Sequence, residues 1–260
     1  MPRPFAGAGY IDRTMSIETQ EELDALRATG RVVARTIRAM RRAVRPGVTT
    51  GELDAVARRE FARAGARSGP QLDYGFPGTT CISVNDEAVH GIPGRRVLRR
   101  GDLVKLDVTA ELDGFYADAC RTVCVGEARP QARRLIQTAE QALAAALEVA
   151  RTGAALNEIG ATVERVVRGR GFSVCDGLMG HGIGRRIHEA PQVPNVFDPG
   201  RSQPLGEGLV MTIEPLVASG GPRVRMGGDG WTVRTADGSW SAHAEHTVVV
   251  RPAGALVLTA

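Results

Sequence analysis

The sequence predicts a mixed α/β fold that is built from two similar halves. Helical periodicity is followed by short β-rich runs, and the same order then repeats. Residues 45–65 also resemble residues 151–171, because Arg, Gly, Glu and Ala recur there at one constant offset. Chance likeness between two helix starts would explain so few identities. A duplication instead predicts two α+β halves that face each other across a sheet, with any site built between them.

Apolar residues at helical spacing predict four long helices. Ser16 and Thr19 form a capping pattern at the start of the first one. Gly65 is placed to end the second, because glycine readily adopts the left-handed conformation that terminates helices. The predicted helical segments are 17–45, 51–64, 130–150 and 156–170.

The β-rich runs lie after each pair of predicted helices. CISVN, LVKLDVTAEL and FYADACRTVCV lie between Phe76 and Val125. LVMTIEPLV, WTVRT and HTVVV follow from Leu209 onward. Asp113-Gly114 is a strong signal for a two-residue turn, so the second and third of these runs are expected to form a hairpin.

Composition bounds the class of protein. With 43% apolar and 24% charged residues, the chain of 260 residues is expected to be globular. No stretch approaches eighteen uninterrupted apolar residues, so no membrane span is expected. The first residues lack the apolar core of a secretory signal, and we therefore expect a cytoplasmic protein.

The cysteines and the basic residues exclude several kinds of site. The cysteines lack paired spacing, which argues against a zinc ribbon or a disulfide framework and favours reduced thiols. The formal net charge is +4, yet the arginines are spread among acids without interleaved aromatic residues. No dedicated nucleic-acid site is therefore predicted. The four cysteines are Cys81, Cys120, Cys124 and Cys175.

Two aspartates flank the predicted hairpin turn. Asp107 and Asp118 fall on the same face of the ladder, directly opposite or diagonal according to where the turn centres. Either aspartate alone would be explained as a solvent-facing residue or a turn cap. Together, with Leu106 and Ala117 beside them, they look embedded, and embedded like charges need a shared cation or proton.

The histidines gather in segments rich in glycine and proline. His181 and His188 lie seven apart in GHGIGRRIHEAP, a segment that cannot form a stable helix and so leaves both rings free to turn inward. His90 lies in a similar context, VHGIP. A lone histidine is more often structural, but neutral imidazole is also the commonest protein ligand for a transition metal. The remaining two, His243 and His246, flank Glu245.

Two further acids interrupt runs that are otherwise typical of strands. Glu214 lies in VMTIEP, and Glu245 lies in AHAEHTVVV. A glutamate inside such a run is rarely buried without a partner, although either could face solvent on an edge strand. With Asp107 and Asp118 they supply four negative charges, and His181 adds a neutral nitrogen. Two divalent ions would balance those four charges, as they do in a dinuclear hydrolase.

This set of residues resembles the type I methionine aminopeptidases of the M24 metallopeptidase family, from about Ile17 to Val250. The resemblance implies the pita-bread α/β fold, in which two pseudo-two-fold halves share a central, mostly antiparallel curved sheet covered by helices. It also implies removal of the initiator methionine from nascent chains with a small second residue. The motifs that carry it are SVNDEAVHGIP, KLDVTAELDGFYAD, GHGIGRRIHEAPQV, MTIEP and GWTVRTADGSWSAHAEHTVVV.

The resemblance also implies a site with two divalent metal ions. Asp107 would hold one ion, and Asp118 and Glu245 would bridge both. His181 and Glu214 would complete the other site. A carboxylate-rich set with one histidine does not select among Mn, Fe, Co and Zn.

Catalytic and specificity residues carry over in the same way. A hydroxide that bridges the ions would attack the first peptide bond, with Glu214 as the proton shuttle. In the family, the residues that match His90 and His188 contact the substrate near that bond. The residues that match Phe76, Cys81 and Trp231 line the methionine pocket.

Two positions depart from the family pattern. Asp73 stands where some members carry an aromatic residue, and Ile187 stands where others have Phe before the second motif histidine. These departures leave methionine preference expected but put the shape of the pocket in doubt.

Other classes of protein share this fold and are alternatives. Prolidases and proline aminopeptidases share the metal set but usually carry a large extra N-terminal domain, whereas sixteen residues precede the first predicted helix. Type II methionine aminopeptidases insert a helical block for which the gap from His188 to Glu214 is too short. Creatine-cleaving relatives lack the ligand set. A non-catalytic ribosome-associated or RNA-binding relative would be expected to have lost ligands.

The expected organisation is an N-terminal extension, residues 1–16, and a single catalytic domain, residues 17–260. The expected partners are nascent polypeptide N-termini. We expect a monomer that associates transiently with the ribosome and has no membrane partner. The extension lacks the Cys/His pattern of a zinc finger, so docking through such a module is not indicated.

Overall fold

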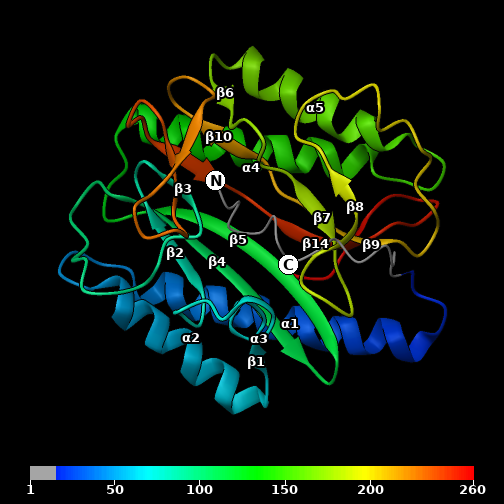
Figure 1. Cartoon of the computed structure of the whole chain (residues 1–260), viewed down its shortest axis with the longest axis horizontal. Helices are drawn as coiled ribbons and strands as arrows, with labels where there is room; N and C mark the ends of the chain where they lie inside the picture. Colours follow the sequence, from blue (N-terminus) through cyan, green and yellow to red (C-terminus); the bar gives the residue numbers. More distant parts are fainter. Residues whose placement is uncertain (1–15) are drawn as a thin grey trace.

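Each half of the chain begins with two long helices, and the two pairs lie on opposite sides of the strands (Figure 1). The computed structural model describes residues 16–260. Within them the four predicted long helices are confirmed, and a short helix lies between the pairs. The helices are α1 (Gln20–Ala43), α2 (Thr50–Ala64), α3 (Gly69–Tyr74), α4 (Pro130–Val149) and α5 (Leu156–Gly169).

The start of α1 differs from the prediction. Thr19, and not Ser16, is the N-cap: its side chain accepts a hydrogen bond from the backbone N–H of Glu22. Ser16 instead forms an isolated β-bridge with Leu209. The predicted pattern contained both hydroxyl residues, and of the two Thr19 caps the helix. The rest of the predicted extension, residues 1–15, lies outside the described residues.

Helix α2 has the ends that its sequence predicts. Thr49 and Glu52 form a reciprocal capping box, which satisfies two backbone N–H groups that the helix leaves free. Gly65 ends the helix with φ 70°, in the left-handed region that favours glycine.

Antiparallel sheets lie between the two pairs of helices (Figure 1). All pairings between the named strands are antiparallel. The strands of the first half are β1 (Arg67–Ser68), β2 (Cys81–Val84), β3 (Glu87–Val89), β4 (Leu103–Leu112) and β5 (Phe115–Cys124). Those that follow are β6 (Ser173–Val174), β7 (Gly180–Gly182), β8 (Glu189–Val193), β9 (Val210–Ile213), β10 (Leu216–Ala218), β11 (Val224–Met226), β12 (Val233–Thr235), β13 (Ser241–His243), β14 (His246–Val249) and β15 (Leu256–Val257).

The long hairpin of β4 and β5 is the predicted one. Leu112 pairs with Phe115, so Asp113 and Gly114 form the two-residue turn, with φ 51° and 84°. Positive φ at both positions is the geometry that Asp-Gly favours, and it fixes the register of the whole ladder.

Hydrogen bonds repeat between the halves and confirm the predicted duplication. Before α2, the N–H of Gly47 donates to the carbonyl of Leu98 at 2.9 Å. Before α5, the N–H of Gly153 donates to the carbonyl of Leu205 at the same distance. Both glycines have positive φ, 90° and 83°. The similarity between residues 45–65 and 151–171 therefore reflects two copies of one arrangement.

Each helical pair covers its own apolar core. The first core packs α1 and α2 against β4, through residues such as Met40, Leu53 and Leu106. The second core packs α4 and α5 against strands of the second half, through residues such as Leu135 and Ile159. All four cysteines are free in the structure. Among residues 16–260, no helix combines the length and hydropathy of a membrane span.

Candidate metal and peptide-binding site

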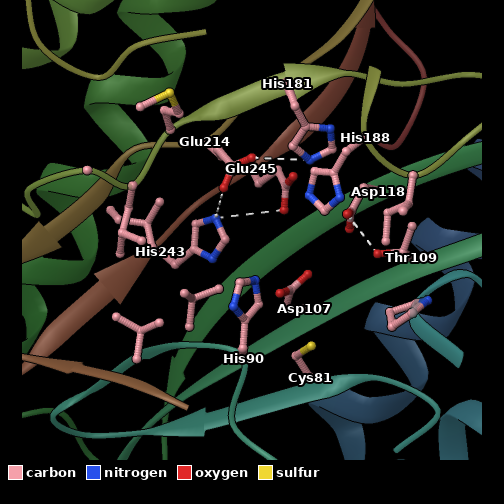
Figure 2. Close-up of a pocket in the computed structure, with 18 of the residues that line it drawn as sticks. Cys81, His90, Asp107, Thr109, Asp118, His181, His188, Glu214, His243 and Glu245 are labelled. Carbon is pink, nitrogen blue, oxygen red and sulfur yellow. Dashed lines mark hydrogen bonds and ion pairs between the residues drawn. The ribbon is translucent and has the colours of Figure 1, made fainter. Parts of the chain in front are cut away.

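A cavity of about 480 Å³ lies between the two halves, and the side chains of most predicted site residues line it (Figure 2). Strands of the first half supply one wall, and strands of the second half supply the opposite wall. The predicted residues in this lining are Phe76, Cys81, His90, Asp107, Asp118, His181, His188, Glu214 and Glu245.

The β4–β5 hairpin brings the two aspartates together. Asp107 pairs with Cys120 and Asp118 pairs with Thr109, so the two carboxylates are diagonal neighbours on one face. One oxygen of Asp118, Oδ2, accepts a hydrogen bond from the Thr109 hydroxyl at 2.7 Å. The backbone N–H of Asp118 donates to the hydroxyl of Thr247, a residue of the second half, at 2.8 Å. The position of Asp118 is therefore fixed from both halves.

His181 lies in β7 between two glycines, where the predicted glycine-rich segment forms a strand. The Nδ1 of His181 lies 2.9 Å from the carbonyl oxygen of Gly182, and a carbonyl only accepts, so the proton is on Nδ1. The lone pair of Nε2 therefore faces the cavity, and Nε2 lies 3.5 Å from Glu214 Oε1. This is the tautomer that a cation-binding imidazole needs.

Both glutamates lie where the chain passes from one sheet to another. Glu214 lies between β9 and β10, and Glu245 lies between β13 and β14. Strands β9 and β14 pair in one sheet, whereas β10 and β13 pair in another. Each of the two predicted β-rich runs is therefore divided into two strands at its glutamate, Glu214 in one run and Glu245 in the other. The division aims the two carboxylates into the space between the sheets.

Burial dominates the electrostatics of the cavity. It raises the pKa of Asp118 to about 6 and that of Glu214 to about 7. Burial and the neighbouring carboxylates raise the pKa values of Asp107 and Glu245 well above their usual ranges. Without a cation, several of these groups therefore hold protons near neutral pH.

The donor set fits a divalent cation. One donor atom each from Asp118, His181 and Glu245 lie within 4.8 Å of one another. The other oxygen of Asp118, Oδ1, is buried and makes no hydrogen bond to the described residues. A buried carboxylate oxygen without a donor is costly unless a cation or proton satisfies it. Carboxylates and imidazole together suit Mn, Fe, Co and Zn.

The predicted substrate residues lie around this cluster. His90 and His188 line the cavity, and the ring of His188 lies 4.1 Å from the ring of His181, measured between centroids. Burial lowers the pKa of His90 to about 3, so its imidazole is neutral. Phe76 lines the cavity. Trp231 is not among the described residues of the lining but packs edge-on against Phe76, with 5.2 Å between ring centroids.

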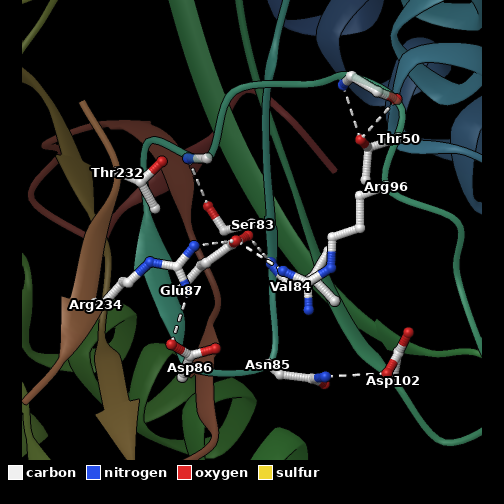
Figure 3. A network of polar contacts seen from close by, with 12 residues as sticks. Thr50, Ser83, Val84, Asn85, Asp86, Glu87, Arg96, Asp102, Thr232 and Arg234 are labelled. Atoms are coloured by element: carbon white, nitrogen blue, oxygen red, sulfur yellow. Dashed lines mark hydrogen bonds and ion pairs between the residues drawn. The ribbon is translucent and has the colours of Figure 1, made fainter. Parts of the chain in front are cut away.

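Ion pairs to the buried carboxylate of Glu87 support the loop that carries His90 (Figure 3). Glu87, in β3, accepts hydrogen bonds from Arg96 at 2.7 Å and from Arg234 at 2.8 Å. Its other oxygen accepts from the backbone N–H of Val84 at 2.6 Å. Because Arg234 belongs to β12, this network also joins the two halves next to the cavity.

Sequence reasoning missed three side chains at the cavity. His243 directs Nε2 toward Glu214 Oε2 at 3.6 Å and Glu245 Oε2 at 3.7 Å. Its position two residues before Glu245 in a β-like run was the available signal, because alternate residues share a face. Thr109 and Tyr74 carried no such signal. Their partners, Asp118 and His188, lie on another strand and in a distant segment.

Comparisons with known proteins identify the family of this chain. Residues 24–252 match the profile of metallopeptidase family M24. The chain is 42% identical to a methionine aminopeptidase of Clostridium perfringens over 243 residues, which cover 94% of this chain and 98% of that protein. It is 40% identical to methionine aminopeptidase 2 of Bacillus subtilis over 247 residues, which cover 94% and 99%.

Solved structures give the same result for the fold. The crystal structure of methionine aminopeptidase from Rickettsia prowazekii has a TM-score of 0.91 at 35% identity, covering 95% of this chain and 100% of that one. The prolidase of Pyrococcus furiosus has a TM-score of 0.76 at 23% identity, covering 94% of this chain but 65% of that one, and shows the shared fold alone. The family profile, the relatives and the solved structures show that this chain belongs to metallopeptidase family M24.

Proposed function

We propose that this protein is a methionine aminopeptidase, which removes the N-terminal initiator methionine from nascent chains and peptides with a small second residue. One observation carries the proposal: Asp118, His181 and Glu245 converge within a cavity between the halves. The family membership and the names of its relatives support the same activity.

The proposed cofactor is a pair of divalent ions. Asp107 would hold one ion, Asp118 and Glu245 would bridge both, and His181 with Glu214 would hold the other. When bound, the ions would polarise the scissile carbonyl and acidify a water molecule. The tautomer of His181 and the unsatisfied Oδ1 of Asp118 support this assignment.

Protein groups then complete the chemistry. Glu214, whose Oε1 lies 3.5 Å from Nε2 of His181 within the cluster, would take a proton from the attacking water and pass it to the departing amine. Neutral imidazoles at His90 and His188 would contact the substrate near the scissile bond. An N–H donor aimed at the carbonyl oxygen stabilises the negative charge that develops there.

The proposed methionine pocket is the apolar part of the cavity. Phe76 and Cys81 would contact the thioether, since sulfur packs well against aromatic and polarizable groups. Trp231 would support the pocket through its edge-on contact with Phe76. Of the two departures from the family pattern, Ile187 lines the cavity, whereas Asp73 turns toward the backbone of Ile187.

The remaining assignments belong to the same proposal. Residues 17–260 would form one catalytic domain after a short extension. The protein would act in the cytoplasm as a monomer on emerging N-termini, with transient contact to the ribosome. It would have no membrane partner and no dedicated nucleic-acid site.

The test is release of free methionine from Met-Ala-Ser and Met-Leu-Ser by protein stripped with a chelator and then given Mn²⁺ or Co²⁺. We expect metal-dependent cleavage of Met-Ala-Ser and at least about tenfold slower cleavage of Met-Leu-Ser, because a bulky second residue blocks the approach to the cluster. An Ala-Pro-Ser peptide is the control. Its preferential cleavage, or silence of folded protein with every metal, would contradict the proposal.

A further inference from the structure

The last residue of α3 contacts an imidazole of the cavity. The hydroxyl of Tyr74 lies 2.5 Å from Nδ1 of His188, and the two rings are tilted by 48° with their centroids 5.4 Å apart. Imidazole nitrogen is a far stronger base than a phenol oxygen, and a phenol is the stronger acid of the two groups. The favoured arrangement therefore has the hydroxyl donating to Nδ1.

This hydrogen bond determines which nitrogen of His188 carries the proton. A neutral imidazole has one N–H and one acceptor nitrogen. With Nδ1 as the acceptor, Nε2 carries the proton at the opposite edge of the ring. His188 lines the cavity, and its ring packs on that of His181. The bond to Tyr74 thus makes His188 a donor toward the bound peptide.

Asp73, the neighbour of Tyr74, fixes the backbone that carries His188. Its Oδ2 accepts a hydrogen bond from the N–H of Ile187 at 3.2 Å, and its Oδ1 accepts from the hydroxyl of Tyr116 at 2.9 Å. Arg186 lies 3.6 Å from the same carboxylate, whose side chain is 10% exposed. The end of α3 therefore holds this segment at two points. Asp73 binds the backbone N–H of Ile187, and Tyr74 binds the imidazole of His188.

We propose that Tyr74 is a positioning residue that holds the Nε2–H of His188 toward the scissile carbonyl oxygen, while Asp73 anchors the loop. This inference rests on the proposed aminopeptidase function. The hydrogen bond from Nε2–H of His188 to the carbonyl oxygen gains strength as negative charge develops on that oxygen. Loss of this hydrogen bond therefore affects kcat more than KM. Partners that orient a site residue are typically worth about 10–100-fold in activity.

The test compares Tyr74→Phe with Tyr116→Phe. Both variants lose one hydroxyl and keep the ring, but only the first loses the bond to His188. We expect Tyr74→Phe to lower kcat on Met-Ala-Ser about 10–100-fold with KM changed less than about threefold. Tyr116→Phe should stay within about threefold of the wild type, because Asp73 keeps its hydrogen bond from the N–H of Ile187 and Tyr74 keeps its bond to His188.

Two further readouts distinguish positioning from a structural effect. Long-range ¹⁵N–¹H correlations on metal-free, histidine-labelled protein should show the Nε2–H tautomer of His188, and a tautomer mixture in Tyr74→Phe. In a His188→Gln background, Tyr74→Phe should have no further effect, because its route to the substrate is gone.

The inference is overturned if Tyr74→Phe keeps both kcat and the tautomer, or if it slows the His188→Gln enzyme as much as the wild type. Unchanged thermal unfolding of the variants excludes misfolding as the cause. Failure of wild-type protein to cleave Met-Ala-Ser would instead refute the proposed function, and the tautomer measurement does not depend on that activity.

Discussion

We expect protons and cations to compete for the same carboxylates in the cavity. Burial raises the pKa of Asp118 to about 6 and that of Glu214 to about 7, so both hold protons at pH values below these. A cation must displace those protons, and its apparent affinity therefore falls as the pH drops through 7 and then 6. Isothermal titration of metal-free protein with Mn²⁺ in buffers of different ionisation enthalpy should detect proton release near pH 6. Binding without proton release would contradict the raised pKa values.

A single carboxylate oxygen is expected to decide activity. Asp118→Asn removes the charge of a proposed bridging ligand but keeps its shape. Because even outer partners of a metal site are worth about 10–100-fold, we expect at least about a 100-fold loss of kcat on Met-Ala-Ser. Asp113→Asn is the matched control in the same hairpin: the residue is exposed, and asparagine tolerates its positive φ. Equal activity of the two variants would contradict the assignment.

Residue types alone predicted the charged part of the site, because acids and histidines in β-rich or glycine-rich segments are unusual. Asp107, Asp118, His181, Glu214 and Glu245 all line the cavity. His243 offered the same kind of signal, a histidine two residues before Glu245, and was missed, whereas the hydroxyl groups offered none. Serine, threonine and tyrosine are common on every surface, and only tertiary contacts select the few that orient a site residue.

At the scale of single elements, glycines in β7 permit a close approach of neighbouring strands. A Cβ at Gly182 would lie 2.0 Å from the carbonyl oxygen of Ala190, so alanine there must move backbone. We expect Gly182→Ala to lower the free energy of unfolding by about 1–3 kcal/mol and to weaken metal binding by shifting His181. Gly206→Ala, where a Cβ meets nothing within 4 Å, should change neither, as thermal unfolding and metal titration would show.

Element types followed from periodicity, whereas their boundaries depended on tertiary contacts. The predicted long helices and the Asp-Gly hairpin are present because spacing and turn chemistry act locally. The run LVMTIEPLV instead forms two strands, because the chain changes sheets at Glu214 and Pro215. Local sequence contains no signal for the sheet that each part of such a run will join.

For the whole molecule, the proposed cation cluster connects two halves that each have their own core. Asp107 and Asp118 come from the first half, and His181, Glu214 and Glu245 come from the second. A cation that binds only the folded state at 100 times its Kd adds about 2.7 kcal/mol to the free energy of unfolding. We therefore expect chelation to lower Tm by several degrees, and added Mn²⁺ or Co²⁺ to restore it in wild type and Asp113→Asn but not in Asp118→Asn. Calorimetry that shows no metal effect would contradict this coupling.

The overall architecture was predictable because the duplication left a trace in the sequence. The likeness of residues 45–65 to 151–171 favoured a two-fold arrangement, and the resemblance to a family supplied the remaining topology. The details of the pocket were not predictable. Asp73, for example, accepts a hydrogen bond from the backbone of Ile187, which is 114 residues away in the sequence.

The most direct test of the account is a stoichiometric metal titration. Metal-free protein receives increasing equivalents of Mn²⁺ or Co²⁺ while bound metal and methionine release from Met-Ala-Ser are measured in the same samples. The account predicts that activity rises with bound metal, that binding saturates at two ions per chain, and that Asp118→Asn stays inactive. Full activity of protein without bound metal, or saturated binding without any release of methionine, would contradict it.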